Sequence, residues 1–245
     1  MRETAPQDFY DRTAEYVSVL LPAAWQALGP ALTRALDGLD TSGGPVVDVG
    51  AGTGESTAAV AGALPAAEIL AVEPHPALRT ALLTRLSADT GLAARVTVLD
   101  SDVLSAELPE HLSGLVAMNV VGHLTPKDRR ALWELLGRKL TADGRAVLNL
   151  YPPTRPEHVP SVPMGEATLG RRRYTGSATA EPAGEDAVTW HMTYRVEQDG
   201  RTLTEFTASD RWYVFTPEQL SAELAGSGLR LTPVDGDHGL HLITR

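Results

Sequence analysis

The sequence has 245 residues, a hydrophobic share of 43% and a formal net charge of −10, from 21 Lys and Arg against 31 Asp and Glu. Such a chain can bury the core of one sizeable α/β domain, but its acidic balance argues against a general nucleic-acid-binding protein, which needs a basic face. The absence of cysteine excludes disulfides, thiolate metal sites and cysteine nucleophiles.

The first predicted element is a helix over residues 8–39, which we expect to break at Gly29-Pro30. We interpret residues 1–40 as an N-terminal helical cap, ended by the glycine-rich linker 41–45. The start of the chain lacks the apolar core of a signal peptide, and polar and proline residues interrupt its apolar stretch. We therefore expect a cytoplasmic protein with no membrane span.

Short apolar runs then alternate with helical stretches up to Tyr151. Four of the five runs are continuously apolar, which is typical of strands buried on both faces of a parallel sheet. Thr125-Pro126 indicates a helix start, and Gly144 is expected to end that helix. The alternation predicts an α/β fold with a doubly wound, mostly parallel sheet of seven strands, the C-terminal tail included. The predicted strands are 46–50, 69–73, 96–100, 115–121 and 145–151, and the predicted helices are 55–64, 76–88 and 127–140.

The pattern changes after this core, which spans residues 46–151. Prolines crowd residues 152–163 and exclude a regular helix or a central strand there. Residues 188–196 alternate between apolar and polar, Asp199-Gly200 predicts a hairpin turn, and 202–215 is the return strand. We interpret 152–215 as an antiparallel insertion or lid within a single domain of residues 1–245. A helix capped by Thr216 and the final strands complete residues 216–245.

A glycine-rich turn, DVGAGTGE, joins a predicted buried strand to a helix at Asp48–Glu55. Glycine permits a tight turn and a close approach of a ligand to the backbone, and the amides of a helix start favour an anion. Gly50, Gly52 and Gly54 have the spacing G-x-G-x-G, whereas a dinucleotide-binding turn has G-x-G-x-x-G. The charge of Glu55 would also oppose a pyrophosphate, which disfavours nicotinamide binding. Because the third glycine has the wrong spacing, a dehydrogenase is the least favoured function.

Acidic residues follow the next two predicted strands. Glu73 ends the second strand, where a carboxylate can accept both hydroxyls of a ribose. Asp102 lies just after the third strand, where an acceptor can reach an adenine amino group, and Asp100 is the competing candidate. Together with the glycine turn, these positions favour a nucleoside cofactor.

Five segments in order, VVDVGAGTG, AVEPHP, LDSDVL, LVAMNVVGHL and LTADGRAVLNLY, resemble the motifs of class I S-adenosylmethionine-dependent methyltransferases. The resemblance covers residues 46–151. It implies that Asp48 supports the glycine turn, that Gly50 and Gly52 border the methionine part of S-adenosylmethionine, and that Glu73 holds its ribose. The remaining contacts that it implies are Ala51, Gly54 and Pro74 to the cofactor, Asp102 and Val103 beside the adenine, and Asn119 near the sulfonium. No metal is implied.

Candidate catalytic and substrate residues carry a weaker signal. His123 follows Asn119 in the fourth motif, and its near-neutral pKa suits a general base, although a histidine that is hydrogen-bonded in the loop is the alternative. Tyr10 and Tyr16 of the N-terminal helix could close over the ligand or pack in the core. Tyr151 and His158 flank the proline-rich segment and are further substrate candidates. Arg171, Arg172 and Arg173 could attract an anionic substrate, or form a solvated face.

The expected reaction is transfer of a methyl group from S-adenosylmethionine to an oxygen, nitrogen or carbon of a small molecule, leaving S-adenosylhomocysteine. The fourth motif lacks the Asn/Asp-Pro-Pro-aromatic run of methyltransferases that act on nucleic-acid amines, which favours a small-molecule substrate. The composition is typical of a high-GC bacterium, where specialised biosynthesis is a plausible setting. Two alternatives stay open: non-methylating chemistry of the cyclase or hydroxylase type that uses the sulfonium charge, and a non-catalytic partner that only binds the cofactor.

Overall fold

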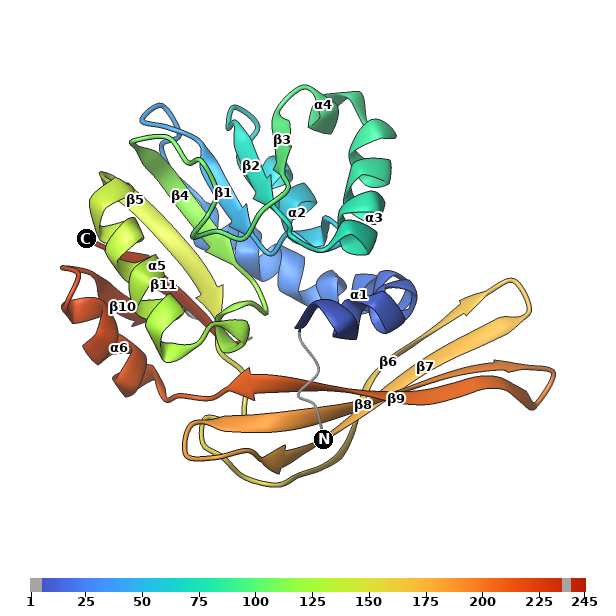
Figure 1. Cartoon of the computed structure of the whole chain (residues 1–245). Coiled ribbons are helices and arrows are strands. Elements are labelled where there is room, and N and C mark those ends of the chain that lie inside the picture. Colours follow the sequence, from blue (N-terminus) through green and yellow to red (C-terminus); the bar gives the residue numbers. More distant parts are fainter. Residues whose placement is uncertain (1–5, 235–238) are drawn as a thin grey trace. The chain divides into compact units, whose positions relative to one another are not determined.

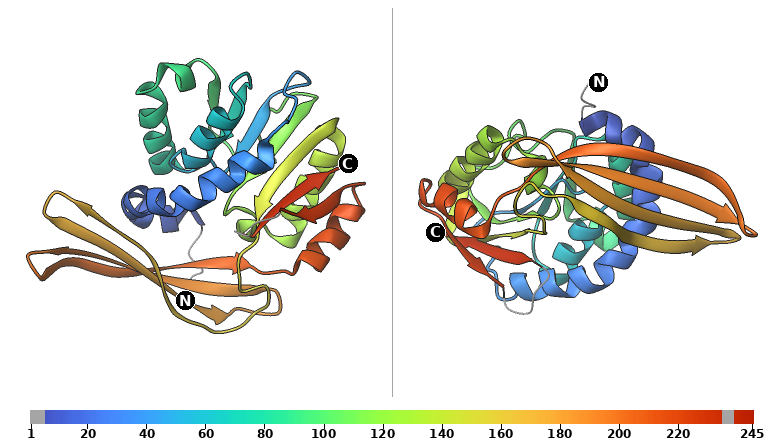
Figure 2. Two further views of the ribbon diagram at one scale, coloured as in Figure 1. Left: turned by 180° about the vertical axis from the view of Figure 1, so that it is seen from behind. Right: turned by 90° about the horizontal axis from the view of Figure 1, so that it is seen from below.

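The computed structural model describes residues 6–234 and 239–245 and divides into two compact units (Figures 1 and 2). One unit comprises the chain up to Gln26 together with Pro153–Val214, and the other comprises Ala27–Pro152 and Phe215–Arg245. Each unit has its own sheet: four antiparallel strands in the first and seven strands in the second. Among the described residues, no helix is both long and apolar enough to span a bilayer.

The N-terminal helix α1 runs without interruption over Pro6–Leu36. The predicted break at Gly29-Pro30 is therefore wrong. Proline removes one backbone hydrogen bond, but Leu28, Ala31 and Leu32 on either side of it are buried. Burial of this apolar face offsets the lost bond and keeps the helix continuous.

The seven-stranded sheet confirms the predicted fold class. Its order is β10-β11-β5-β4-β1-β2-β3; β3, β2, β1, β4 and β5 run parallel, and β11 and β10 are antiparallel (Figure 1). The strands are β1 (Val46–Val49), β2 (Ile69–Val72), β3 (Val96–Leu99), β4 (Leu112–Ala117), β5 (Leu140–Asn149), β10 (Arg230–Pro233) and β11 (Leu240–Thr244). The helices of this unit, beyond the end of α1, are α2 (Glu55–Ala63), α3 (Pro76–Ser87), α4 (Thr90–Ala93), η1 (Val121–His123), α5 (Pro126–Lys139) and α6 (Pro217–Ala225).

Helices pack on both faces of this sheet. Leu132, Trp133 and Leu136 of α5 and Leu220 of α6 share one buried apolar cluster with side chains of β1, β2, β4 and β5. Leu82 and Leu86 of α3 pack with Ala71 of β2 in a second cluster. These two layers leave the carboxyl ends of the parallel strands as the edge where connecting loops meet, the place where open α/β sheets bind ligands.

Two predicted boundaries in this unit are wrong. Strand β5 begins at Leu140, directly after α5, so Gly144 lies inside the strand and does not end the helix. A side chain at Gly144 would meet Thr141 and the Ser113 carbonyl at less than 3 Å, so close packing within the sheet explains this glycine. Strand β4 ends at Ala117, earlier than predicted, because the chain turns into the left-handed region at Asn119 (φ 59°).

The antiparallel insertion sheet consists of β6 (Val159–Leu169), β7 (Arg172–Pro182), β8 (Ala187–Gln198) and β9 (Arg201–Tyr213), in that order (Figure 2). The sequence predicted β8 and β9 and their turn at Asp199-Gly200, where both residues have positive φ. It did not predict β6, which carries Pro160 and Pro163. This strand tolerates proline because it lies at the edge of the sheet and its register is interrupted there.

Alternation gives this sheet one apolar face, as the pattern of β8 predicted. Tyr194 and Val196 of β8 pack with Tyr174 of β7 against Tyr16 and Leu20 of α1. The opposite face carries polar pairs, among them Arg195 with Glu205 of β9. The two faces explain why a sheet of this kind needs the N-terminal helix to bury its apolar side.

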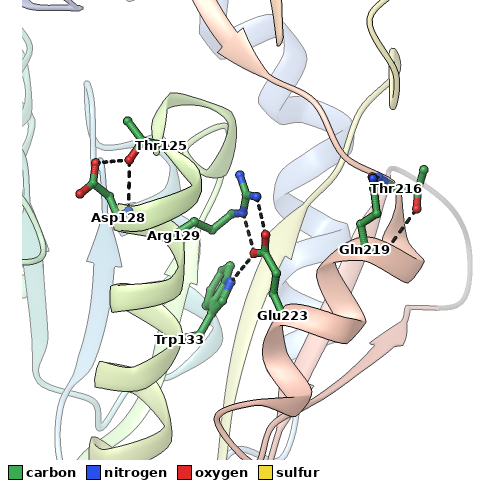
Figure 3. Close-up of polar contacts among 7 residues, drawn as sticks. All are labelled: Thr125, Asp128, Arg129, Trp133, Thr216, Gln219 and Glu223. Atoms are coloured by element: carbon green, nitrogen blue, oxygen red, sulfur yellow. Dashed lines mark hydrogen bonds and ion pairs between the residues drawn. The ribbon is translucent and has the colours of Figure 1, made fainter. Parts of the chain in front are cut away.

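An ion pair joins α5 to α6 in the other unit (Figure 3). Arg129 donates through Nε and Nη2 to both oxygens of Glu223, at 2.8 and 2.6 Å, and the indole N–H of Trp133 donates to the same carboxylate at 3.1 Å. The guanidinium also lies 4.3 Å from the centre of the Phe215 ring. Burial alone would raise the pKa of Glu223, but the hydrogen bond and charge of Arg129 outweigh it and hold that pKa below its usual range.

Candidate functional site

The glycine turn lies at the carboxyl ends of β1 and β2. Val49 and Val72 are partners at these ends, and the amide of Ala51 donates to the Val72 carbonyl at 3.0 Å. The amide of Gly52 donates to the Glu73 carboxylate at 2.8 Å. The structure thus brings the predicted glycine turn into direct contact with Glu73, the residue predicted to bind the ribose.

The three glycines of the turn are needed for different reasons. All have positive φ: 62° at Gly50, 57° at Gly52 and 91° at Gly54. A Cβ at Gly50 would lie 2.6 Å from a methyl of Val120, and one at Gly54 would lie 2.8 Å from Leu82. A Cβ at Gly52 would meet no protein atom closer than 3.8 Å. Close packing therefore accounts for Gly50 and Gly54, whereas a Cβ at Gly52 would make only an ordinary contact with the Gly50 carbonyl, so packing within the protein does not account for this glycine.

Asp48 is fully buried beneath the turn. Its Oδ2 accepts hydrogen bonds from the hydroxyls of Ser56 (2.7 Å) and Thr57 (2.6 Å), both in the first turn of α2. Its Oδ1 has no hydrogen-bond partner within residues 6–234 and 239–245. Burial raises the pKa of Asp48 to about 6, in spite of the hydrogen bonds from Thr57 and Ser56. A buried acceptor of this kind would gain from a donor on a ligand.

Glu73 is 4% exposed, and both its oxygens are engaged. Oε2 accepts from the Gly52 amide and Oε1 from the His75 amide, each at 2.8 Å. Burial raises its pKa above the ordinary value, more than these hydrogen bonds lower it. Since a carboxylate has about four acceptor positions, two remain for the hydroxyls of a ribose. Pro74 follows at this strand end, and its carbonyl accepts from Arg79 at 2.9 Å.

The two aspartates after β3 have separate partners. Asp100 pairs with Arg79 of α3 at 2.8 Å. Asp102 is exposed, and its carboxylate accepts from the amides of Leu104 (2.9 Å) and Ser105 (3.1 Å) and from the Ser105 hydroxyl (2.8 Å). It therefore holds the turn that places Val103, which is 4% exposed, in the main apolar cluster.

Asn119 and His123 belong to the segment between β4 and α5. The Asn119 amide donates to Oδ1 of Asn149 at 2.6 Å, and Nδ2 of Asn149 donates to Oδ1 of Asn119 at 2.7 Å. His123 is half-buried at the end of η1, and its backbone amide donates to the Val120 carbonyl at 2.8 Å. Val120 in turn contacts the side-chain position of Gly50, so this segment adjoins the glycine turn.

The substrate candidates belong to both units. Tyr16 is buried among Tyr174, Tyr194 and Phe206 in the unit that contains the insertion sheet. Tyr10 of the same unit stacks edge-to-face on Phe9, at 5.1 Å between ring centres. His158 also belongs to it and is exposed, with Nδ1 2.9 Å from Glu181. Tyr151, in the other unit, is 46% exposed.

The arginine run does not present an open cluster of three charges. Arg171 pairs with Asp199 at 2.5 Å, and Arg173 pairs with Glu166 at 2.5 Å and with Glu197 at 3.4 Å. These acidic partners come from neighbouring turns and strands and compensate the charges of Arg171 and Arg173. The pairing favours the interpretation as a solvated face over an anion-binding patch.

Sequence reasoning missed two residues at this site. Asn149 ends β5 and fixes Asn119; a polar residue at the end of a predicted buried strand was the available signal. Arg85 of α3 donates through Nε to the Thr53 carbonyl at 2.9 Å and pairs through Nη2 with Glu55. No local pattern reveals this contact, because the two segments are 30 residues apart. With its charge compensated by Arg85, Glu55 is also a weaker argument against a pyrophosphate than its sequence position suggested.

Comparisons with known proteins agree with this arrangement. Residues 47–146 match the family model described as "Methyltransferase domain", and no curated protein matches the sequence. An amino pentose methyltransferase from Micromonospora echinaspora, involved in calicheamicin biosynthesis and solved with S-adenosylmethionine, superimposes with a TM-score of 0.73 at 20% identity, over 90% of this chain and 91% of that one.

Two further structures have the same fold. DesVI of Streptomyces venezuelae gives a TM-score of 0.70 at 18% identity, covering 99% of both chains. A sugar N-methyltransferase from Streptoalloteichus gives 0.68 at 18% identity, covering 90% of this chain and 87% of that one. The family match over the parallel core and these shared folds confirm the resemblance found in the five sequence motifs. The chain therefore has the class I methyltransferase fold, and its residues 47–146 match the model of a methyltransferase domain.

Proposed function

We propose that this protein is an S-adenosylmethionine-dependent methyltransferase that methylates an amino group of a small molecule of the amino-sugar class. The observation that carries the cofactor is Glu73, a buried carboxylate fixed by the amides of Gly52 and His75 at the end of β2. The amino-sugar class is suggested by the named activities of structurally similar proteins, an amino pentose methyltransferase and a sugar N-methyltransferase.

The residues at the turn fit this cofactor. The absence of a side chain at Gly52 lets a ligand approach the backbone there, and Glu73 retains acceptor positions for the ribose hydroxyls. The buried Oδ1 of Asp48 would accept a donor such as the amino group of the methionine part. Asp102 and Val103 would flank the adenine. When bound, S-adenosylmethionine supplies a methyl group on a positively charged sulfur, which is already electrophilic.

The protein's contribution to the reaction is then alignment and proton transfer. Asn149 holds Asn119 in a left-handed conformation beside the glycine turn, which fixes the wall of the site next to His123. An ammonium must lose a proton before its nitrogen can attack, and the imidazole of His123 would accept that proton. The insertion sheet would shape the choice of acceptor.

Calorimetric titration of S-adenosylhomocysteine tests the cofactor assignment. The wild type should bind with a Kd in the micromolar range, about −8 kcal/mol. Glu73→Gln should weaken binding, because it replaces one acceptor by a donor facing the amides and the ribose. Binding that is unchanged by this substitution, in a variant that unfolds at the same temperature as the wild type, would contradict the role of Glu73.

Incubation with methyl-labelled S-adenosylmethionine and a panel of amino sugars, with the matching hydroxyl sugars as controls, tests the acceptor. The label should appear on nitrogen. A product that contains no label would support the alternative of non-methylating chemistry, and labelled hydroxyl sugars would contradict the proposed amine.

A further inference from the structure

A buried carboxylate stands at the start of the helix that follows the glycine turn. Glu55 is the first residue of α2, and its side chain is 6% exposed. The amides of a helix start attract an anion, and the proposed function places the carboxylate of the cofactor's methionine part near this turn. An uncompensated charge on Glu55 would repel that carboxylate through a poorly screened environment.

Arg85, on the neighbouring helix α3, is placed to cancel this charge. Its Nη2 pairs with Oε1 of Glu55, and Oε2 of Glu55 accepts from the Thr53 hydroxyl. The guanidinium comes from an element outside the motif and is 38% exposed, so solvent hydrates the side of it that does not face Glu55. The pair leaves the start of α2 without net charge from side chains at this position.

The same arginine also binds the turn itself. Its Nε donates to the carbonyl of Thr53, inside G-x-G-x-G, at 2.9 Å. A Cβ at Gly54 would lie 3.1 Å from Cδ and 3.3 Å from Nε of Arg85. Arg85 therefore packs against the third glycine of the turn. A side chain at Gly54 would crowd the arginine, so the glycine makes room for it.

Asp48 gives an independent sign that a ligand donor belongs here. It is completely buried under the turn, and its Oδ1 has no hydrogen-bond partner among the described residues. An amino acid moiety would bring an ammonium toward Asp48 and a carboxylate toward the amides of the turn. The negative charge of Glu55 would repel the carboxylate of this amino acid moiety but would attract its ammonium.

We infer that Arg85 is a positioning residue for the amino acid part of the cofactor: it neutralises Glu55 and fixes the Thr53 carbonyl, so that the start of α2 accepts a carboxylate. The inference rests on the proposed function and adds a residue from α3 to the cofactor-binding machinery. The inference assigns different residues to the two parts of the ligand: Arg85 affects binding of the amino acid part, whereas Glu73 holds the nucleoside part.

Two ligands distinguish this role from a structural one. S-adenosylhomocysteine carries the amino acid part, and 5′-methylthioadenosine lacks it. Arg85→Met should raise the Kd of S-adenosylhomocysteine about tenfold or more, by exposing the cofactor carboxylate to an unpaired Glu55. The same substitution should change the Kd of 5′-methylthioadenosine less than about twofold. Adding Glu55→Gln to Arg85→Met should restore most of the affinity for S-adenosylhomocysteine.

Arg95→Met is the matched control, because Arg95 is an arginine that hydrogen-bonds at the opposite, carboxyl end of α2. It donates to the carbonyls of Ala61, Leu64 and Ala67 at 3.0–3.1 Å, so its loss should lower the unfolding temperature without discriminating between the ligands.

Equal weakening of both ligands by Arg85→Met would overturn the inference, as would failure of Glu55→Gln to restore binding in a folded double variant. The single variant Glu55→Gln keeps Arg85 and provides a test if the Arg85 variants fail to fold. A tenfold loss of affinity for S-adenosylhomocysteine in Glu55→Gln would also contradict charge cancellation. A wild-type protein that binds 5′-methylthioadenosine but not S-adenosylhomocysteine would refute the inference while sparing the nucleoside site. Binding of neither ligand would overturn the proposed function and this inference with it.

Discussion

Asn119 and Asn149 exchange hydrogen bonds across the ends of the neighbouring strands β4 and β5. One bond runs from the Asn119 backbone amide to the Asn149 side chain at 2.6 Å, and the other joins the two side chains at 2.7 Å. Asn119 has a φ of 59°, in the left-handed region that residues with a Cβ seldom adopt. Asn149 is 6% exposed and thus holds a strained turn from within the sheet.

Asn149→Ala should destabilise the fold and slow the reaction. It removes the acceptor for a backbone amide and the partner of a side chain, which costs about 1–3 kcal/mol when the groups stay buried. Denaturant unfolding measures the stability, and initial rates of methyl transfer at saturating cofactor measure the activity. If Asn149→Ala had the stability and the methyl-transfer rate of the wild type, the Asn119–Asn149 pair would have no role in positioning the site.

Substitutions of Asn119 itself separate backbone strain from the side-chain bond. Asn119→Gly and Asn119→Ala both lose the side-chain bond to Asn149 and keep the bond from the backbone amide, but only alanine keeps a Cβ in the left-handed region. We expect the alanine variant to be about 1 kcal/mol less stable than the glycine variant. Equal unfolding free energies would mean that the turn relaxes to another conformation.

Gly52→Ala should abolish cofactor binding at a modest cost in stability. The new methyl group would block the approach of the cofactor to the backbone of the turn without clashing with the protein, and a φ of 57° costs alanine about 1–2 kcal/mol. Gly62→Ala is the control, because Gly62 is an exposed helical glycine of α2 with no atom near its side-chain position, where alanine should add up to about 1 kcal/mol. Calorimetry with S-adenosylhomocysteine should detect binding to the Gly62 variant alone.

Asp48 should make stability fall as pH rises through a defined range. Its pKa is about 6 in the folded protein against an ordinary value of 3.8, so the folded state holds the proton more tightly than the unfolded state. The contribution of protonated Asp48 is complete below pH 3.8 and is lost as pH rises to about 6, with a magnitude on the order of 3 kcal/mol.

The comparison with Asp48→Asn isolates this effect from other carboxylates. The difference in unfolding free energy between wild type and variant should change across that range and be flat above it. A difference that is constant with pH would show that Asp48 titrates normally. The slope is the relevant quantity, since the amide also changes the hydrogen bonds to Ser56 and Thr57.

Glu223→Ala should destabilise the protein by about 3–5 kcal/mol, because it leaves the guanidinium of Arg129 buried without its partner. The double variant Arg129→Met with Glu223→Leu should recover most of this loss, since well-packed apolar residues can replace a buried ion pair. Urea unfolding of the wild type and both variants measures the effect. A single variant as stable as the wild type would show that water reaches the arginine.

The parallel core could be predicted from sequence because its strands are buried on both faces and therefore read as continuous apolar runs. Lys139 and Leu140 show the limit: the helix ends and the strand begins without any glycine or proline between them, so the boundary was placed five residues too late. Strand β6 escaped prediction because its prolines argue against a strand, and only its position at the sheet edge makes them acceptable.

The site divides in the same way. Gly52 and Glu73 stood out in the sequence because each belongs to a motif that lies at the end of a predicted strand. Asn149 and Arg85 act through contacts between segments distant in the chain, which local patterns do not encode. Tyr16 shows the opposite case, since an aromatic residue on an amphipathic helix fits a substrate wall and a core equally well, and the structure buries it among three other rings.

The insertion sheet takes all its ladder bonds from one continuous stretch of chain, β6 to β9, and shares none with the seven-stranded sheet. Mutations that alter a strand of this sheet leave the backbone pairing around the glycine turn intact. The gene can therefore vary one stretch of about sixty codons while the codons for the cofactor turn stay fixed. If the insertion sheet selects the acceptor and the glycine turn binds the methyl donor, as proposed, a chain organised in this way can diverge toward new acceptors without first losing its donor.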